Sequence, residues 1–371
     1  MKSSHSCCGT TGLCSGTTWA ALMGFALLGS LLAAPCAWSG TVVSGEVNGL
    51  WDLPGSPYWV EGDLLLLADS TLTIQSGVEV RFRGPYRFLV NGNLQAEGTE
   101  LDSIIFTWDE PQAAMEWRGI RLVEAADGTL LEYCRIEHAR SAESYPDVRG
   151  GGVYCQACSL VTIRHCLLQH NMSHNENWNG LGAGVACVDA YALIEHCVIR
   201  NNQADSGGGI AAMDDGVATI RNNLISGNIA FYSGGGIYVG AWSTPAIENN
   251  IIKDNAADGW GGGGITLWNC NALSQRMVSN NIVVGNWTSA VGGGLYIRYE
   301  CSIYENNTIA DNTAETAGGG VYVLNQGGDE CPQILNGIIW GNTAPLDPAI
   351  HLHADTTAVV VSYCDVEGGW E

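Results

Sequence analysis

Aromatic and charged residues recur at fixed positions after a series of glycine runs, and these residues could do chemistry. The segments after the runs alternate apolar and other residues, so successive side chains should point to opposite faces. One outward set comprises Tyr154, Tyr238, Thr266, Tyr296, Tyr322 and His351, and the next comprises Gln156, Met213, Trp268, Arg298, Leu324 and His353. Rings flanked by polar groups suit stacking on sugars, whereas cross-strand aromatic packing is the alternative. The pattern predicts a binding face containing Tyr238, Trp242, Trp268, Tyr296, Arg298, Glu300 and Tyr322.

Catalytic groups are harder to find in the sequence. Glycoside hydrolysis requires two carboxylates facing each other across the substrate, and Asp214-Asp215 is the nearest candidate. A turn after the preceding strand is the other interpretation of this pair. A lyase needs a base together with acids that hold calcium, and Arg298 with Glu300 is the closest match. The catalytic residues therefore stay unassigned.

Metal-binding and disulfide patterns are equally incomplete. His165 and His196 share one repeat position, and His351 and His353 point to one face of a strand, but a third metal ligand cannot be named for either pair. We therefore predict no metal site. The column of Cys134, Cys166 and Cys197 is interpreted as stacked buried thiols. Cys301 and Cys331 are the best disulfide candidates, because neighbouring coils bring Cα atoms about 4.8 Å apart.

These residues must be positioned by a repeat. Seven glycine runs lead into an aliphatic residue, and successive aliphatics lie 25 to 32 residues apart. Each of seven asparagines also follows an aliphatic residue by three positions; they are Asn171, Asn202, Asn228, Asn255, Asn286, Asn312 and Asn342. A period of this length indicates a solenoid. Period-two alternation over three to five residues predicts strands, and no window carries helical periodicity.

We therefore predict an all-β fold, a single-stranded right-handed parallel β-helix with about three short strands per coil. Glycine permits sharp turns, and stacked asparagine amides can hydrogen-bond from coil to coil as a structural ladder. One coil alone cannot bury enough apolar surface to offset its conformational entropy, so the coils must stack. Residues 63–371 form this β-helix, with the glycine and asparagine repeats starting at about 133, and residues 40–62 are expected to cap it. No cap is visible before Glu371, so we expect a C-terminal truncation.

The N-terminal segment and the net charge of the chain predict its cellular location and its class of partner. Residues 1–39 resemble a signal peptide of bacterial-type export, with Lys2, an apolar stretch and small residues before a cleavage point. No later segment could span a membrane. The formal net charge is −23, and such a field repels phosphate backbones, which excludes nucleic acid as a partner. A secreted or cell-surface monomer is expected.

The repeat is similar to that of the pectin-lyase-like superfamily of right-handed parallel β-helix proteins, over about residues 60–371. The pairing of Gly234-Gly235-Gly236-Ile237 with Ile252-Lys253-Asp254-Asn255 also resembles polymorphic outer-membrane proteins, but the phenylalanine of their motif is absent. Asp214-Asp215 is similar to the aspartate pair of polygalacturonases, without their Gly-His-Gly and Arg-x-Lys elements. The resemblance implies the fold and leaves the activity open.

The sequence therefore favours a glycan-binding or adhesive β-helix without catalysis, whose partner is an extracellular glycan or another surface molecule. The alternative is a polysaccharide lyase or glycoside hydrolase that acts in a groove on the same face. No cofactor is expected, and calcium would be needed only by the lyase.

Overall fold

The computed structural model describes residues 40–109, 116–142, 144, 147–240, 242–270, 276–325, 331–354 and 358–369. The predicted signal peptide at 1–39 lies outside them. Residues Ser39–Glu371 form one compact unit. Its described residues form strands β1 to β41 and one short 3-10 helix, η1 (Leu53–Gly55), and no α-helix. Within these ranges, no helix has the length and hydropathy needed to cross a membrane.

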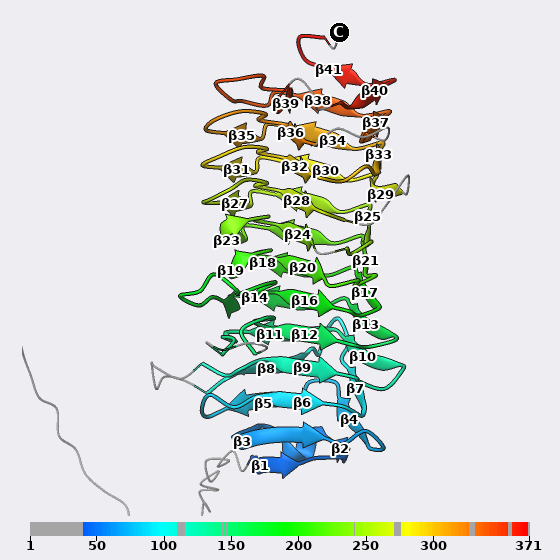
Figure 1. Ribbon diagram of the computed structural model, residues 1–371. Helices are drawn as coiled ribbons and strands as arrows, with labels where there is room; N and C mark the ends of the chain where they lie inside the picture. The colour runs from blue at the N-terminus through cyan, green and yellow to red at the C-terminus, as the bar shows by residue number, and fades with distance from the viewer. Residues whose placement is uncertain are drawn as a thin grey trace, which may run out of the picture. The chain divides into compact units, whose positions relative to one another are not determined.

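Each coil adds one strand to each of three parallel sheets, and the coils stack on one another (Figure 1). The first, here called the glycine-led sheet, contains the strands that follow the glycine runs. Its strands are β6 (Phe88–Val90), β9 (Ile120–Val123), β12 (Val153–Gln156), β16 (Val185–Val188), β20 (Ile210–Met213), β24 (Ile237–Gly240), β28 (Ile265–Trp268), β32 (Leu295–Arg298), β36 (Val321–Leu324) and β39 (Ile350–Leu352).

The second sheet receives the next strand of each coil. Its strands are β2 (Gly49–Trp51), β4 (Thr71–Gln75), β7 (Asn93–Glu97), β10 (Thr129–Glu132), β13 (Val161–Arg164), β17 (Ala192–Glu195), β21 (Thr219–Arg221), β25 (Ala246–Glu248), β29 (Arg276–Ser279), β33 (Ile303–Glu305), β37 (Gln333–Leu335) and β40 (Val360–Ser362). The third sheet consists of β5 (Glu79–Phe82), β8 (Ile104–Trp108), β11 (Cys134–Glu137), β14 (Leu167–Gln169), β18 (Val198–Arg200), β22 (Leu224–Ser226), β26 (Ile251–Lys253), β30 (Ile282–Val284), β34 (Thr308–Ala310), β38 (Ile338–Trp340) and β41 (Asp365–Val366). This arrangement confirms the predicted all-β solenoid.

The predicted cap at 40–62 is part of the stack. β1 (Thr41–Glu46) pairs in parallel with β3 (Tyr58–Leu66), and β2 pairs in parallel with β4. β3 crosses the expected boundary between residues 62 and 63, and it pairs with both β5 and β6. Segment 40–62 therefore supplies the first coil, because its alternating residues continue the strand pattern of the coils above it.

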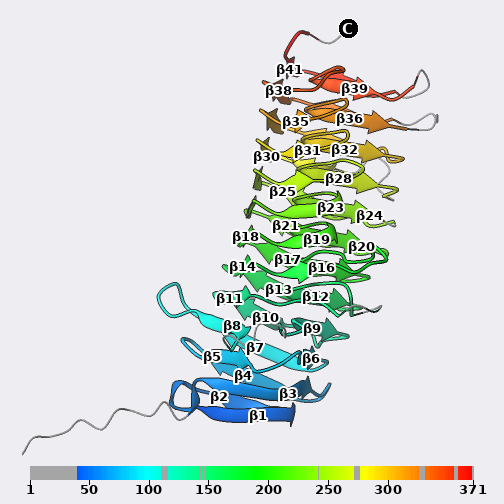
Figure 2. The same cartoon turned by 90° about the vertical axis from the view of Figure 1, so that its left-hand side faces the viewer.

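A fourth, narrow sheet was not predicted. This edge sheet joins the third sheet to the glycine-led sheet in six coils (Figure 2). Its strands are β15 (Met172–Ser173), β19 (Gln203–Ser206), β23 (Ile229–Ser233), β27 (Ala256–Ala257), β31 (Trp287–Thr288) and β35 (Thr313–Ala314). Strands of two residues carry too little alternation for periodicity to detect. Their inward residues are small and buried, as at Ala230 and Ala257.

The asparagine column forms a continuous ladder of buried amides. The side-chain Oδ1 of Asn255 accepts hydrogen bonds from the backbone N–H and the Nδ2 of Asn228, both at 3.0 Å. The Asn255 Nδ2 in turn donates to Ile225 O and to Asn286 Oδ1, both at 3.0 Å. The same pattern continues from Asn171 to Asn342. Each amide therefore satisfies backbone groups that the turn would otherwise leave unpaired.

A second ladder combines cysteine and asparagine. Cys134 N and Cys166 N each donate to the sulfur of the cysteine in the next coil at 3.4 Å, and Cys197 N donates to Asn223 Oδ1 at 2.9 Å. The thiol sulfur thus replaces the amide oxygen as acceptor in these coils. Burial raises the pKa of the Cys134 and Cys197 thiols. The column is a stack of buried thiols, in agreement with its interpretation from sequence.

This second ladder breaks at Gly337, which follows Asn307 in the column. We expect Gly337→Asn to stabilise the protein by about 1 kcal/mol, because its amide would accept from the backbone N–H of Asn307. A Cβ at this position would meet its nearest atom, Asn307 O, at 3.4 Å, which is ordinary contact. The measurement is the urea midpoint at unchanged slope. A lower midpoint would show that the column cannot be extended.

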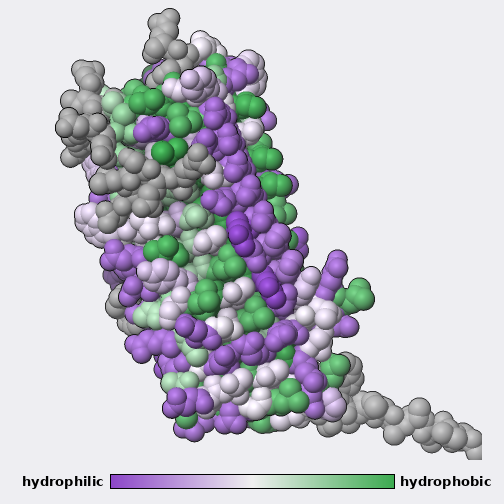
Figure 3. All heavy atoms as spheres, turned by 90° about the vertical axis from the view of Figure 1, so that its right-hand side faces the viewer, coloured by the Kyte–Doolittle hydropathy of each residue, from purple (hydrophilic) through white to green (hydrophobic). Residues whose placement is uncertain are grey.

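The second sheet carries alternating charges in register on its outer face. Glu132, Arg164, Glu195 and Arg221 pair successively across strands β10, β13, β17 and β21. Arg164 Nε lies 2.9 Å from Glu132 Oε1, and Arg221 Nη2 lies 2.8 Å from Glu195 Oε2. Figure 3 shows a hydrophilic band along the stack on the side that presents this sheet. Opposite charges on adjacent strands stabilise the pairing, so the row from Glu132 to Arg221 has a structural role.

Candidate functional site

The predicted outward row of the glycine-led sheet is in register. Tyr238 pairs with Thr266, Thr266 with Tyr296, and Tyr296 with Tyr322. These tyrosines are nevertheless only 5 to 6% exposed. Turns next to the edge sheet pack over them: Leu181 belongs to the cluster of Tyr238, and Ala317 to that of Tyr296 and Tyr322.

This burial corrects the sequence interpretation of Tyr238, Tyr296 and Tyr322 as a surface for sugars. Burial also raises the pKa of all three phenols. They pack beneath the turns of the edge sheet. This agrees with the alternative interpretation of the sequence, in which the rings pack against neighbouring strands.

The exposed rings gather around one guanidinium. The Arg298 Cζ lies 5.1 Å from the centre of the Trp260 ring, 5.0 Å from that of Trp268 and 4.9 Å from that of Tyr299. Trp260 is 50% exposed and Trp268 is 39% exposed. Tyr232 stacks on Trp260 with centroids 5.4 Å apart. We call Tyr232, Trp260, Trp268, Arg298 and Tyr299 the aromatic–arginine cluster.

The cluster is a platform on which a ligand can rest. The space among its side chains is a cavity of about 10 Å³, enough for one water molecule at most. Arg298 Nε is buried and hydrogen-bonds to no described residue. Cation–π contacts with the three rings hold the guanidinium in place.

Trp242 and Glu300, the other predicted site residues, lie in different environments. Trp242 is 54% exposed, and its backbone N–H donates to Asn269 O in the next coil. Glu300 faces the core, where its carboxylate accepts hydrogen bonds from Ser302 and Tyr304. Tyr299 has a positive φ of 54°, which turns the chain and points the next side chain inward. Glu300 is therefore removed from the binding face, and the Arg298–Glu300 lyase pair is not formed.

Glu300 should make stability depend on pH. Burial raises its pKa above the ordinary 4.5, so the folded state holds the proton more tightly than the unfolded state. The contribution of Glu300 to the free energy of unfolding is fully present below pH 4.5, and it is lost as the pH rises through the pKa of Glu300 in the folded state. We expect Glu300→Gln to remove this loss, so the variant should gain stability over the wild type as pH rises above 4.5. Urea unfolding across this range measures the difference, and parallel curves would contradict the assignment.

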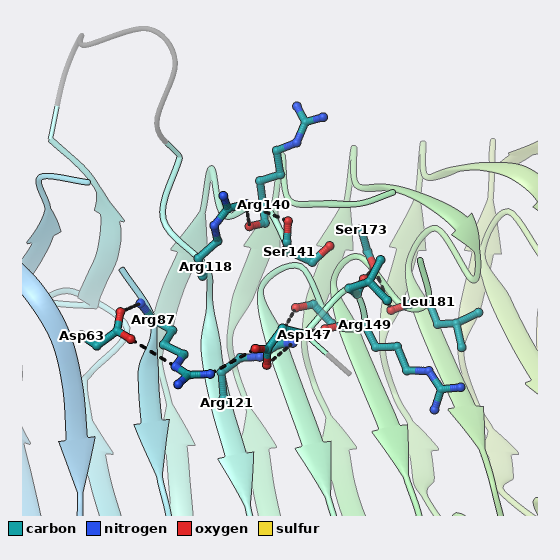
Figure 4. Close-up of polar contacts among 12 residues, drawn as sticks. Asp63, Arg87, Arg118, Arg121, Arg140, Ser141, Asp147, Arg149, Ser173 and Leu181 are labelled. Atoms are coloured by element: carbon teal, nitrogen blue, oxygen red, sulfur yellow. Dashed lines mark hydrogen bonds and ion pairs between the residues drawn. The ribbon is translucent and has the colours of Figure 1, made fainter. Parts of the chain in front are cut away.

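A polar network occupies the lower coils of the glycine-led sheet (Figure 4). Arg121 is buried, and its Nη1 donates to Arg149 O and Gly150 O at 2.6 Å. Its Nη2 lies 3.6 Å from Asp147 Oδ1, and Asp147 Oδ2 lies 3.1 Å from Arg87 Nη1. Burial lowers the pKa of Arg121 to about 10. These contacts secure the loop at 147–150 against the sheet.

The remaining predicted groups are dispersed. Asp214 follows β20 in a turn with positive φ, and Arg149 Nη1 lies 3.0 Å from its Oδ2. The His165 and His196 rings stack at 5.1 Å. Among the described residues, no three His, Cys, Asp or Glu side chains are placed to share a metal ion. The Cys301 sulfur accepts a hydrogen bond from Asn325 Nδ2 at 3.4 Å, and the disulfide between Cys301 and Cys331 stays a prediction.

Sequence reasoning missed Trp260 and Tyr232. Trp260 stands between Gly259 and Gly261, in a turn that no alternating segment contains. Tyr232 belongs to β23, whose pairing with β19 is irregular between Ala204 and Ser206. The only signal for Trp260 was its position before a glycine run.

The stacked coils define a parallel β-solenoid. Residues 118–314, more than half of the chain, match the family model described as the right handed beta helix region. The protein therefore belongs to the right-handed β-helix family. The chain is similar to the A-module of the Azotobacter vinelandii mannuronan C-5 epimerase AlgE6, with 16% identity, a TM-score of 0.37, and coverage of 88% of this chain and 90% of that one. A likeness at this level carries no information about activity. No curated protein matches the sequence.

Proposed function

We propose that this protein is an exported or surface-exposed β-helix that binds carbohydrate on the aromatic–arginine cluster without cleaving it. One observation carries the proposal: two tryptophans, each at least 39% exposed, flank a guanidinium that their rings hold in place. Ring faces contact the apolar face of a sugar, and the guanidinium donates to its oxygens.

The surroundings of the cluster favour binding over catalysis. None of the described residues that line its cavity is a carboxylate, and Glu300, two residues after Arg298, faces the core. Glycoside hydrolysis by the common route needs two carboxylates across the bond. The platform therefore has the features of a binding surface, and its chemistry at the sugar is hydrogen bonding and stacking.

Catalysis is the second candidate function, and one observation favours it. Tyr322 Oη lies 2.5 Å from His353 Nδ1, and His351 Nδ1 lies 2.8 Å from Asp347 Oδ2, on the same sheet as Arg298. A phenol paired with an imidazole can transfer protons. A lyase or hydrolase would place its substrate over this pair.

A panel of polysaccharides, incubated with the purified protein with and without calcium, tests the proposal. We expect at least one glycan to be retained, with no new reducing or unsaturated ends. New ends would establish the enzyme instead. Neither retention nor cleavage would leave a structural spacer.

A further inference from the structure

The aromatic–arginine cluster continues along the stack into a track of ring contacts. Phe231 precedes Tyr232 on β23, and its ring contacts the His174 ring, with centroids 5.0 Å apart. The His174 ring lies edge-on to that of Trp178, with centroids 5.9 Å apart. Trp178 is 55% exposed. Contacts therefore run from Trp178 to Arg298 and connect residues that are far apart in sequence.

A β-bulge makes the track continuous. Ala204 pairs with Ala230 and Ser206 pairs with Ser233, so Phe231 and Tyr232 together oppose the single residue Asp205. In a regular strand one of these two rings would point inward. The bulge instead leaves both rings half-buried at the surface, so Phe231 contacts the loop after β15, two coils below, and Tyr232 contacts the coil above. Bulges are used at functional sites to re-aim side chains in this way.

Asp205 fixes the imidazole at the lower end of the track. It is fully buried, and its Oδ1 lies 2.5 Å from His174 Nδ1. Its Oδ2 accepts from Gly180 N at 2.7 Å and from Asn175 N at 3.3 Å. A carboxylate only accepts hydrogen bonds, so His174 Nδ1 carries the hydrogen, and when the ring is neutral its Nε2 is an acceptor. No described residue hydrogen-bonds to Nε2.

Resting on the proposed function, the geometry points to a linear glycan that lies along the stack from Trp268 to Trp178 and donates a hydroxyl hydrogen bond to His174 Nε2. From Trp268 to Trp178 the track covers three coil-to-coil steps, or about 14 Å at the spacing of parallel strands. A single sugar cannot contact both ends. Rings that alternate with polar groups match a chain whose units each offer an apolar face and hydroxyls. His174 and Trp178 are thus a distal subsite, and Asp205 is a positioning residue.

Binding of oligosaccharides cut from the retained polysaccharide, from the single sugar to chains longer than the track, tests this inference by calorimetry. We expect affinity to rise with length until the chain spans the track. Trp178→Ala or His174→Ala should weaken binding of the long chains about tenfold and leave that of the short ones unchanged. Trp340→Ala is the matched control, because Trp340 is 50% exposed and lies on the third sheet.

Asp205→Asn supplies an independent readout. The amide introduced by this change would donate from Nδ2 to His174 Nδ1, so Nε2 would become a donor. Binding of the long chains alone should then weaken. The affinity is measured on variant protein that still melts cooperatively. Affinity that does not depend on length, or Trp178 and His174 variants that bind long chains normally, would overturn the track while short-chain binding still supports the cluster. Retention of no glycan, or of an extended peptide instead, would overturn both proposals.

Discussion

Replacing Asn255 by alanine should lower the free energy of unfolding by about 3 to 6 kcal/mol. The change leaves the N–H and Nδ2 of Asn228 and the Ile225 carbonyl without their partner in a buried turn. Each buried polar group left unpaired costs about 1–3 kcal/mol. Asn255 also links three successive coils through the ladder, so its replacement should destabilise the neighbouring coils as well as its own turn. Urea unfolding followed by circular dichroism measures the midpoint.

Two further variants isolate the cause of this loss. Asn306→Gly removes an exposed amide at a turn with φ of 57°, where glycine is favoured, and should change stability by no more than about 0.5 kcal/mol. Asn255→Asp keeps the shape but removes both donors and buries a charge, so it should cost at least as much as alanine. Equal midpoints for wild type and Asn255→Ala would show that the ladder does not hold the coils together.

The second large effect is expected from Gly293→Ala. A Cβ on Gly293 would lie 2.4 Å from Gly319 O and 2.6 Å from Thr313 O, both of which are backbone atoms. Neither atom can move without opening the spacing between coils. We expect a loss of about 3 kcal/mol or more, at the upper end of overpacking effects. The thermal midpoint and the yield of soluble protein report it.

Gly337→Ala is the matched control for Gly293→Ala. Its Cβ would meet nothing closer than 3.4 Å, and its φ is not positive. We expect a change within about 0.5 kcal/mol. If both variants lose stability equally, the loss comes from replacing any glycine of the β-helix. The close approach of backbones would then not explain why glycine occupies position 293.

The regular part of the fold could be predicted because each coil repeats the same environment. The spacing of the glycine runs placed Ile237, Ile265 and Leu295 at successive positions, and they pair in the structure. The asparagine spacing likewise identified the column that carries the amide ladder. A residue that pairs with the equivalent residue of the next coil must occupy the same position in each repeat. The repeat spacing in the sequence therefore predicts the register of the strands.

The site could be predicted only in part, because it depends on irregular segments. The outward direction of Tyr238 was correct, but the edge turn that buries it contains no periodic pattern. The inward direction of Glu300 depends on the positive φ of Tyr299. The track depends on one extra residue in β23, and a bulge has no signature in a five-residue strand. Trp268 and Arg298, which stand at the ends of regular strands, are the predicted site residues that the aromatic–arginine cluster contains.

The most direct test of the binding surface compares glycan-array retention of Trp268→Ala with that of Trp340→Ala. Both side chains are well exposed, and they lie on different sheets. We predict that Trp268→Ala loses most of the retention while Trp340→Ala keeps that of the wild type. Equal retention by the two variants would show that carbohydrate does not bind at the aromatic–arginine cluster.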